Sequence, residues 1–470
     1  MDERQDAPIE LLVTSDPDTL DPRYVTDAVG LRVSRLVHAG LMRLDPDSGA
    51  PVPYLAERVE TSDDGAFVTF TLRPNLEFHS GAPLTAHDVK ETLLAFKDPV
   101  VASRHARVLS AIDSVTEVDA RTVRVHLSRP HATTLTDLEI PILRADQARL
   151  PPDPNGMLDG AGPFFVSYRR RGAITLSPAA HGAMPTPKHA VRVRAVRDEN
   201  ARALRMLSGD SDAVAGGISP PLLGPLERQG LRVYSRPSLA LTYMVLRVDR
   251  PPFDRDVARA ALSRSIDRDA IVKYLLGGRA TAASGMLAPT HWAHANAPTL
   301  PFDPSNARES LGGRVHATLL CGADRLRVDI ARAIAQQAKE GGVDLEVVPL
   351  ELGALLARLG SGDFDASTLQ LAELVEPNTL RVFLHSTSIP PAGSNRGRVH
   401  DPELDALLDE GDATIDRDRR RDIYAHMEAL IARRSWILPL WYEDQIVVTG
   451  PRAARFMPSA EGRWLSLADL

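Results

Sequence analysis

A strand–helix–strand pattern in residues 316–348 constrains the fold of this chain more than any other feature. Residues 316–320 are apolar and strand-like, residues 328–339 have the spacing of an amphipathic helix closed by glycine, and residues 344–348 return as a strand. Two strands joined in this way pair in parallel within one sheet, through a right-handed crossover. The pattern therefore predicts an α/β unit.

Other segments extend this mixture along the whole chain. Residues 66–73 alternate apolar and polar side chains, as a half-buried strand does. Thr85 is placed to cap a helix, with Asp88 at the third helical position. Further strands are expected at 9–13, 121–127, 163–168, 173–177, 190–197, 211–214 and 438–448, and further helices at 31–41, 200–208, 255–265, 267–276, 401–411 and 423–434. With 470 residues, the chain is predicted to be α/β to α+β in two or more lobes.

Composition excludes several classes of protein. Hydrophobic residues make up 43% and charged residues 25% of the chain, which is typical of a globular protein. No apolar stretch approaches the roughly 20 residues that span a bilayer, so no transmembrane helix is expected. The net charge is −7 and no long basic run occurs, which argues against nucleic acid or an anionic membrane as the main partner.

Candidate metal ligands are few. Cys321 is the single cysteine, so neither a disulfide nor a cysteine-based zinc site can form, and its apolar neighbours favour a buried thiol. His291 and His294 could chelate a metal if they lay on a helix, but Pro289 just before them favours a loop. No metal and no cofactor are predicted.

Signatures of catalysis are missing from the sequence. No dinucleotide-binding or phosphate-binding glycine motif, no H-E-x-x-H and no G-x-S-x-G elbow occurs. The mixed-sign run at residues 416–422 is typical of a solvated helix face. Residues 1–6 have neither a basic region nor an apolar one, so they are not expected to be a signal peptide. The chain is predicted not to be an enzyme.

A series of short motifs, in a fixed order, carries a family resemblance. They are Thr19-Leu20-Asp21-Pro22, Phe78-His79-Ser80-Gly81-Ala82-Pro83-Leu84-Thr85-Ala86-His87-Asp88-Val89, Gly160-Ala161-Gly162-Pro163-Phe164, Pro251-Pro252-Phe253-Asp254 and Asp401-Pro402-Glu403-Leu404. Together they resemble the extracytoplasmic solute-binding proteins of ABC importers, in family 5, the oligopeptide-, dipeptide- and nickel-binding family. The motifs run from about residue 19 to residue 448.

The resemblance implies a two-lobed periplasmic-binding-protein fold of the α/β class, with a hinge and ligand bound between the lobes. An extra α+β subdomain is inserted in the first lobe of such proteins. The inserted subdomain would be residues 42–162 and the second lobe residues 244–444. The first lobe would be discontinuous, with residues 1–41, 163–243 and 445–470. The segment 149–162, rich in proline, glycine and aspartate, is predicted to connect lobes.

The resemblance also implies ligand-binding residues. In peptide-binding members an aspartate three residues before an acidic-proline pair binds the ligand amine, and Glu373 takes that place here, before Glu376. Gln370 stands where a tryptophan is common, and Arg247 where an asparagine is usual. Tyr243, on the strand that precedes Arg247, is predicted to bind ligand as well. A structural salt bridge at Glu373 and a surface position for Arg247 remain alternatives.

The predicted function is capture of a small solute, a short peptide or other amine-bearing compound, for delivery to an ABC importer permease. A non-peptide solute is kept open by the altered site residues. The chain is predicted to be monomeric and to act outside the cytoplasm, in a periplasm or lipid-anchored at the cell surface, with the signal segment absent from this sequence. Two alternatives are a cytoplasmic metabolite sensor and a hydrolase on the same fold.

Overall fold

The computed structural model describes residues 7–153, 155, 157–295 and 300–470. The prediction that residues 1–6 are not a signal peptide therefore lies outside the described residues. The chain divides into two compact units. Unit 1 is Met1–Arg236 with Gln445–Leu470, and unit 2 is Pro237–Asp444. Two long strands, β12 (Arg232–Leu246) and β17 (Ile437–Thr449), each contain residues of both units.

Unit 1 contains a mixed sheet in the order β11-β1-β10-β9-β8. Its strands are β1 (Ile9–Val13), β8 (Phe164–Arg170), β9 (Ala173–Pro178), β10 (Val191–Ala195) and β11 (Ala213–Ala215). β1 runs parallel to both β10 and β11, while β9 is antiparallel to β10 and β8. All five residues of β1 are buried, as expected for a central strand covered on both faces.

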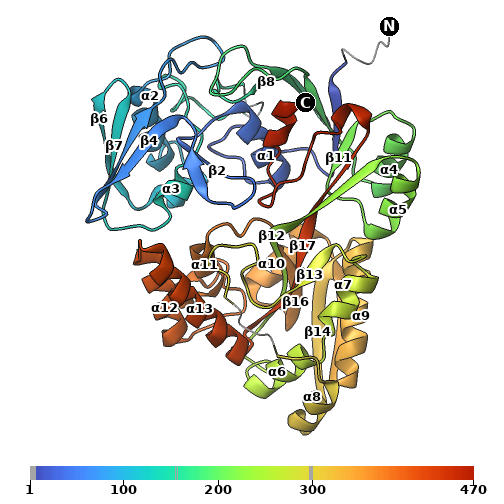
Figure 1. The fold of residues 1–470 in the computed structure, drawn as a ribbon. Coiled ribbons are helices and arrows are strands. Elements are labelled where there is room, and N and C mark those ends of the chain that lie inside the picture. The colour runs from blue at the N-terminus through green and yellow to red at the C-terminus, as the bar shows by residue number, and fades with distance from the viewer. Residues whose placement is uncertain (1–6, 154, 156, 296–299) are drawn as a thin grey trace. The chain divides into compact units, whose positions relative to one another are not determined.

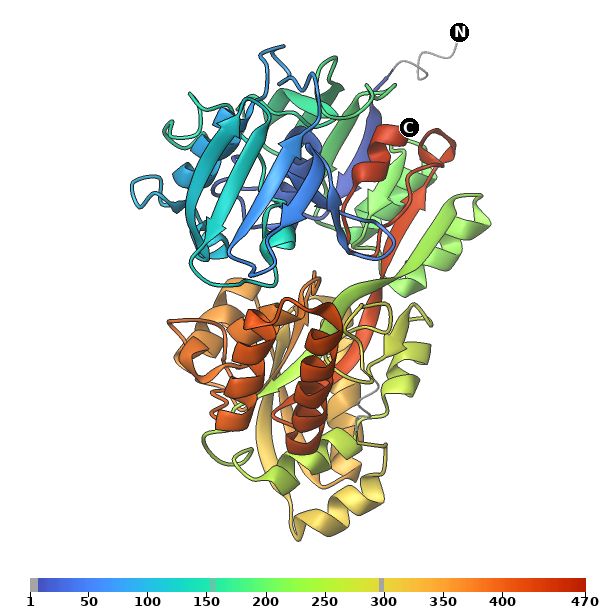
Figure 2. The same cartoon turned by 60° about the vertical axis from the view of Figure 1, so that its left-hand side comes forward.

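A second, antiparallel sheet in unit 1 has the order β4-β5-β7-β6 (Figure 2). It has a hydrophobic core of its own. Its strands are β4 (Ala56–Thr61), β5 (Phe67–Leu72), β6 (Ile112–Asp119) and β7 (Thr122–Leu127). The alternation predicted for β5 is present, since Val68, Phe70 and Leu72 are buried and the residues between them are partly exposed. Residues 42–162 thus contain a sheet with a core of its own, and the inserted subdomain with these bounds stays a prediction.

Helices and short strands complete unit 1. The helices are α1 (Ala28–Val37), α2 (Ala86–Lys97), α3 (Thr134–Asp137), α4 (Glu199–Leu207) and α5 (Pro220–Arg228), with 3₁₀ turns at Ala106–Leu109, Pro451–Ala453 and Leu465–Asp469 and a ribbon of β2 (Met42–Leu44) and β3 (Pro51–Pro53). The predicted helix at 31–41 starts earlier, because the Asp27 side chain accepts from the Gly30 N–H at 2.8 Å. It also ends earlier, because Gly40 forms a β-bridge with Pro141.

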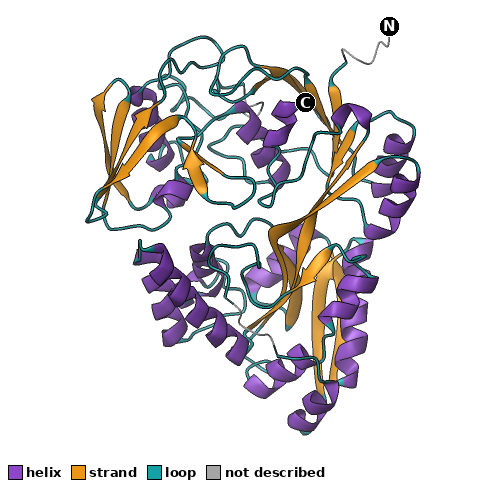
Figure 3. Ribbon diagram, in the orientation of Figure 1, coloured by secondary structure: helices purple, strands orange, loops and turns teal. Residues whose placement is uncertain are grey.

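In unit 2 the sheet order is β15-β14-β16-β12-β17, and β13 pairs with β17. The additional strands are β13 (Ala280–Ala282), β14 (Val315–Gly322), β15 (Val343–Leu350) and β16 (Ala366–Leu371). β14 is parallel to β15 and to β16, and helix α9 (Arg325–Glu340) connects β14 to β15, as the strand–helix–strand pattern predicts. Figures 1 and 3 show helices along both sides of these strands.

The other helices of unit 2 are α6 (Asp256–Arg264), α7 (Arg268–Tyr274), α8 (Pro304–Leu311), α10 (Leu352–Ser361), α11 (Leu380–Leu384), α12 (Pro402–Ala413) and α13 (Arg417–Arg434), with 3₁₀ turns at Pro377–Thr379 and Ser386–Ser388. Helix α13 begins six residues before the predicted start at residue 423. The reason is the Asp416 side chain, which accepts from the Arg419 N–H at 2.7 Å and caps the helix at the charged run.

The segment 149–162 lies in unit 1, in its described part. The Arg23 guanidinium donates to the carbonyl of Leu150 at 2.7 Å, and the Asp153 N–H donates to Asp21 at 3.1 Å. Arg23 and Asp21 are fully buried and form an ion pair at 2.6 Å. These contacts tie the segment to the loop that follows β1.

The start of α2 generates a stability prediction. The Asp88 carboxylate accepts from the Thr85 N–H at 2.9 Å, from the Thr85 hydroxyl at 3.0 Å and from the Ala145 N–H at 2.9 Å. Asp88→Ala leaves these donors without their acceptor, so we expect unfolding free energy to fall by about 2 kcal/mol. Urea unfolding followed by circular dichroism measures the loss. Asp63→Ala, at an exposed position, is the control, and an equal loss in both variants would contradict the prediction.

Candidate functional site

The carboxyl ends of three parallel strands meet at one edge of the unit 2 sheet. β14 ends at Gly322, β15 at Leu350 and β16 at Leu371. Helix α9 begins three residues after β14, where the Asp324 side chain accepts from the Arg327 N–H at 3.0 Å. Ligands of open α/β sheets bind outside the carboxyl ends of the strands. This edge is therefore the candidate site on unit 2.

Glu373 lies at this edge, two residues after the end of β16. Its side chain is half-buried, and the next residue is tied to β12, since the Leu374 N–H donates to the Leu239 carbonyl at 3.3 Å. The strand and this backbone bond together restrict where the Glu373 carboxylate can point. A carboxylate in such a setting can bind an ammonium or guanidinium group.

His291 forms a hydrogen bond with the segment that contains Glu373, residues 373–376. Its Nδ1 accepts from the Ala293 N–H at 3.0 Å, so the proton is on Nε2, which donates to the Val375 carbonyl at 2.8 Å. Burial, reinforced by the nearby Arg420 charge, lowers the pKa of His291 to about 4. The ring is consequently neutral near pH 7 and acts as a fixed hydrogen-bonding link.

Arg420, on α13, fixes the other end of the same segment. Its guanidinium pairs with the Glu376 carboxylate at 3.1 Å and lies 4.9 Å from the centre of the Trp292 ring. Arg420 is 4% exposed. The prediction that the run at 416–422 is a solvated face is therefore wrong for this residue, because a mixed-sign run does not reveal which side chain turns toward the core.

Glu428 lies about two helical turns after Arg420 on α13, and it forms hydrogen bonds with the loop that contains His291. The buried carboxylate accepts from the Leu287 N–H at 2.8 Å and from the Ala295 N–H at 3.3 Å. The Tyr442 hydroxyl donates to the Gly285 carbonyl at 2.7 Å in the same loop. Burial raises the pKa of Glu428 to about 7, against the opposing effect of the backbone donors.

The histidine pair is not a chelating site. Both ring nitrogens of His291 are used within the protein, and His294 Nδ1 bonds the Leu287 carbonyl at 2.8 Å. Over the described ranges of the chain, no group of three or more histidine, cysteine or acidic side chains is placed to hold a metal ion. Cys321 is buried, as expected, at the end of β14.

Gln370 and Tyr243 lie on opposite faces of the sheet. β12 and β16 are antiparallel, with Thr242 opposite Gln370 and Tyr243 opposite Leu369, so the two predicted residues belong to alternate pairs. Gln370 is exposed. Tyr243 is 3% exposed and lines a cavity of about 10 Å³, which has room for about one water molecule. The structure does not bring Gln370 and Tyr243 together.

Arg247 lies at the end of the β12–β16 strand pair that is opposite to Glu373. Its N–H donates to the Asp365 carbonyl at 2.8 Å, just before β16 begins, whereas Glu373 follows the end of β16. The intervening strand is about 20 Å long at roughly 3.3 Å per residue. The Arg247 guanidinium bonds Asp249 and the Gly362 carbonyl. The structure thus separates Arg247 from Glu373 and gives it partners within unit 2.

An ion pair between Arg327 and Glu443 lies on the same face of the sheet as Gln370, and no sequence pattern predicted it. Arg327 contacts Glu443 at 2.7 Å and 3.3 Å, and the Thr242 hydroxyl donates to the same carboxylate at 2.7 Å. Burial raises the pKa of Glu443, but the Arg327 charge and these hydrogen bonds outweigh it and hold the pKa below its ordinary value. Both side chains are about a quarter exposed. The signal available in the sequence was the position of Arg327 at the start of a helix that follows a strand.

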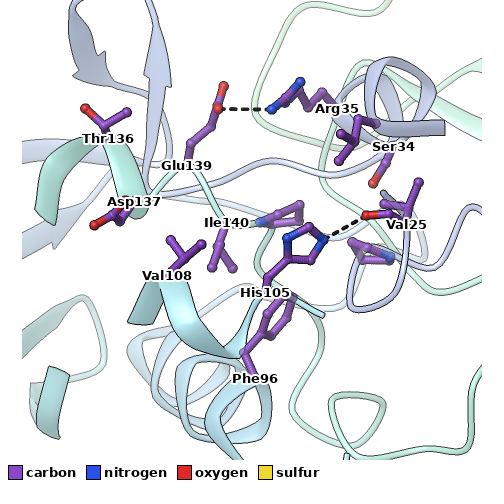
Figure 4. Close-up of a pocket in the computed structure, with 13 residues that line it drawn as sticks. Val25, Ser34, Arg35, Phe96, His105, Val108, Thr136, Asp137, Glu139 and Ile140 are labelled. Carbon is purple, nitrogen blue, oxygen red and sulfur yellow. Dashed lines mark hydrogen bonds and ion pairs between the residues drawn. The ribbon is translucent and has the colours of Figure 1, made fainter. Parts of the chain in front are cut away.

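Unit 1 contains a cavity of about 160 Å³ that is shown in Figure 4. Figure 4 places Arg35 and Glu139 facing each other, 3.6 Å apart, and Phe96 and Val108 away from them. His105 Nε2 lies 2.8 Å from the Val25 carbonyl, and burial lowers the pKa of this ring. Its lining combines charged, polar and apolar side chains from separate segments, which is why no local pattern predicted it.

Within the described ranges, no helix has both the length and the apolar character needed to cross a membrane.

Comparison with known proteins places the chain in a family. The model for "Bacterial extracellular solute-binding proteins, family 5 Middle" matches residues 50–387. The chain belongs to this family of solute-binding proteins. A probable di/tripeptide-binding protein 5 of Pseudomonas aeruginosa is 26% identical, over 90% of this chain and 88% of the relative. The glutathione-binding protein GsiB of Pectobacterium atrosepticum is also 26% identical, over 89% and 85%.

Solved structures show the same fold. The substrate-binding protein CtaP from Listeria monocytogenes has a TM-score of 0.86 at 24% identity, with 98% of each chain covered. NikA from Brucella suis, in complex with Fe(III)-EDTA, has a TM-score of 0.87 at 19% identity, with 98% of this chain and 99% of that chain covered. The predicted class, an α/β two-lobed periplasmic-binding-protein fold, is confirmed.

Glu428 generates a prediction on pH dependence. Its raised pKa means that the folded state binds more protons than the unfolded state between pH 4.5 and about 7. Its contribution to stability is thus fully present below about pH 4.5 and is lost as pH rises through about 7. Glu428→Gln cannot titrate. We expect the wild type to lose roughly 2–3 kcal/mol relative to this variant across that window.

Denaturant unfolding at a series of pH values checks the prediction. His291, whose folded-state pKa is lowered, contributes a change of opposite sign, but it is present in both proteins and cancels in the difference. The control is Glu403→Gln, at an exposed side chain of α12. Parallel stability curves for wild type and Glu428→Gln would contradict the prediction.

Proposed function

We propose that this chain captures a short peptide or another amine-bearing solute outside the cytoplasm and delivers it to an ABC importer. Membership of a family of extracellular solute-binding proteins supports the receptor role. The observation that carries the choice of solute is the Glu373 carboxylate, placed at the carboxyl edge of the unit 2 sheet.

The named relatives support an amine-bearing solute. One is a probable di/tripeptide-binding protein and the other a glutathione-binding protein. Di- and tripeptides and glutathione share a free α-amine, which is charged at neutral pH. A receptor for such molecules needs an anion at a defined position, and a carboxylate is the side chain that provides it.

Binding by Glu373 follows from ordinary electrostatics. An ammonium group removed from water is costly unless it meets a charged or polar partner. A carboxylate forms short, charge-assisted hydrogen bonds with it. Because Leu374 is tied to β12 and Val375 to His291, the segment is ordered before the solute arrives, so less conformational entropy is lost on binding.

The proposal also includes a permease as the partner and a location outside the cytoplasm. The chain would act as a monomer that hands its solute to an importer permease, either free in a periplasm or lipid-anchored at the cell surface. It would not catalyse a reaction, in keeping with a family of substrate-binding proteins. Nothing in the described residues favours the sensor or the hydrolase alternative.

A matched pair of ligands tests the amine anchor. Wild-type protein is expected to bind trialanine at least tenfold more tightly than N-acetyl-trialanine, because acetylation removes the ammonium. Glu373→Gln is expected to remove most of this preference, since a hydrogen bond to a charged group contributes about 1.5–3 kcal/mol. Isothermal titration calorimetry measures both affinities. Glu346→Gln, at an exposed glutamate of β15, is the control, and an unchanged preference in Glu373→Gln would disprove the anchor.

Native mass spectrometry of gently purified protein tests the class of solute directly. After denaturing release, we expect a series of masses that differ by amino-acid residues. A single non-peptide mass would show that the natural solute is not a peptide.

A further inference from the structure

Unit 1 has a polar hollow of about 390 Å³ at the carboxyl edge of its own sheet. It is lined by Arg169, Arg170, Arg171 and Arg197, together with Asp16 and Asp18. We call it the arginine hollow. Asp16 and Asp18 follow the end of β1, Arg197 follows the end of β10, and the other arginines belong to the β8–β9 hairpin.

The hollow is held in shape by contacts between the hairpin and the loop after β1. The Arg169 guanidinium donates to the Pro17 carbonyl at 2.7 Å. The Gly172 N–H donates to the Asp16 carboxylate at 2.9 Å. Gly172 has a φ of +80°, which glycine adopts without strain, so the hairpin turns sharply at this point. These contacts hold Arg169 and the turn of the hairpin beside the ends of β1 and β10.

Four guanidinium groups gather at the hollow in a chain whose net charge is −7. Asp16 and Asp18 line the hollow too, and they act on Arg169 together with Asp27 and Asp153. In the described part of the chain, the side chains of Arg170, Arg171 and Arg197 make no hydrogen bond or ion pair. The neighbouring arginines on β10 differ, because Arg192 and Arg194 both pair with Glu10.

We propose that the arginine hollow is an anion subsite, which takes a carboxylate or a phosphate group. A guanidinium group is planar and always charged, and it binds either anion through two parallel hydrogen bonds. The carboxyl edge of an open α/β sheet is also where such proteins bind their ligands. That the anion is part of the imported solute rests on the proposed function. Anion binding itself does not.

If the anion is part of the solute, the subsite narrows the solute class. The arginine hollow would then select a solute that carries an acidic group, such as a peptide with an acidic side chain, over a neutral peptide.

The first experiment uses inorganic phosphate as the probe, in calorimetric titrations of the full chain at low ionic strength. Wild type is expected to bind phosphate saturably, and the double variant R171Q/R197Q to bind it at least tenfold more weakly. The control is R228Q/R232Q, which removes two exposed arginines of the same unit outside the hollow. Absence of saturable binding to wild type, or equal weakening in both double variants, would overturn the proposal.

A second experiment distinguishes an acidic solute from a free anion. Wild type is titrated with Ala-Ala-Glu and with Ala-Ala-Gln, which differ in one charge. A preference for the acidic peptide that R171Q/R197Q abolishes assigns the subsite to the solute. Phosphate binding without that preference assigns it to a free anion.

The variant Glu373→Gln distinguishes a failure of the anion subsite from a failure of the proposed peptide binding. It is expected to leave phosphate affinity unchanged, because Glu373 belongs to the other unit. If wild type binds neither peptide, the peptide proposal fails, while the phosphate titration still decides whether the anion subsite exists.

Discussion

A buried carboxylate on helix α13 underlies the arrangement of the unit 2 site. Glu428 accepts backbone N–H groups from the loop that contains His291. His291 in turn donates to Val375, two residues after Glu373. A buried backbone donor without an acceptor is costly, so each of these links must be kept for the loop to stay folded. The position of the proposed amine anchor therefore depends on this polar network.

Parallel strand pairing accounts for where the polar groups gather in both units. In unit 2 the strands β14, β15 and β16 end beside Glu373 and Arg327, and in unit 1 the strands β1 and β10 end beside the arginine hollow. Chain turns at such an edge leave the sheet, so side chains there are free of the packing that restricts strand interiors.

Much of the fold could be predicted from the sequence, because the signals are local. The alternation in β5, the pairing of Thr85 with Asp88 and the strand–helix–strand run were all visible as spacing. The site was harder to predict. Family resemblance pointed to Glu373, but it also grouped Arg247, Gln370 and Tyr243, which the structure places at a distant strand end and on opposite sheet faces. Their separation follows from strand register, which no single segment contains.

The sequence by itself determined the class of the protein, most of its strands and helices, and the motifs of its family. Only the tertiary structure decided which charged side chains are buried, as with Arg420 and Glu428, and which converge on a hollow, as with Arg171 and Arg197. The physical reason is the range of the interactions. Helix caps and strand alternation act over a few residues, whereas burial and charge convergence depend on segments that are far apart in the chain and meet only on folding.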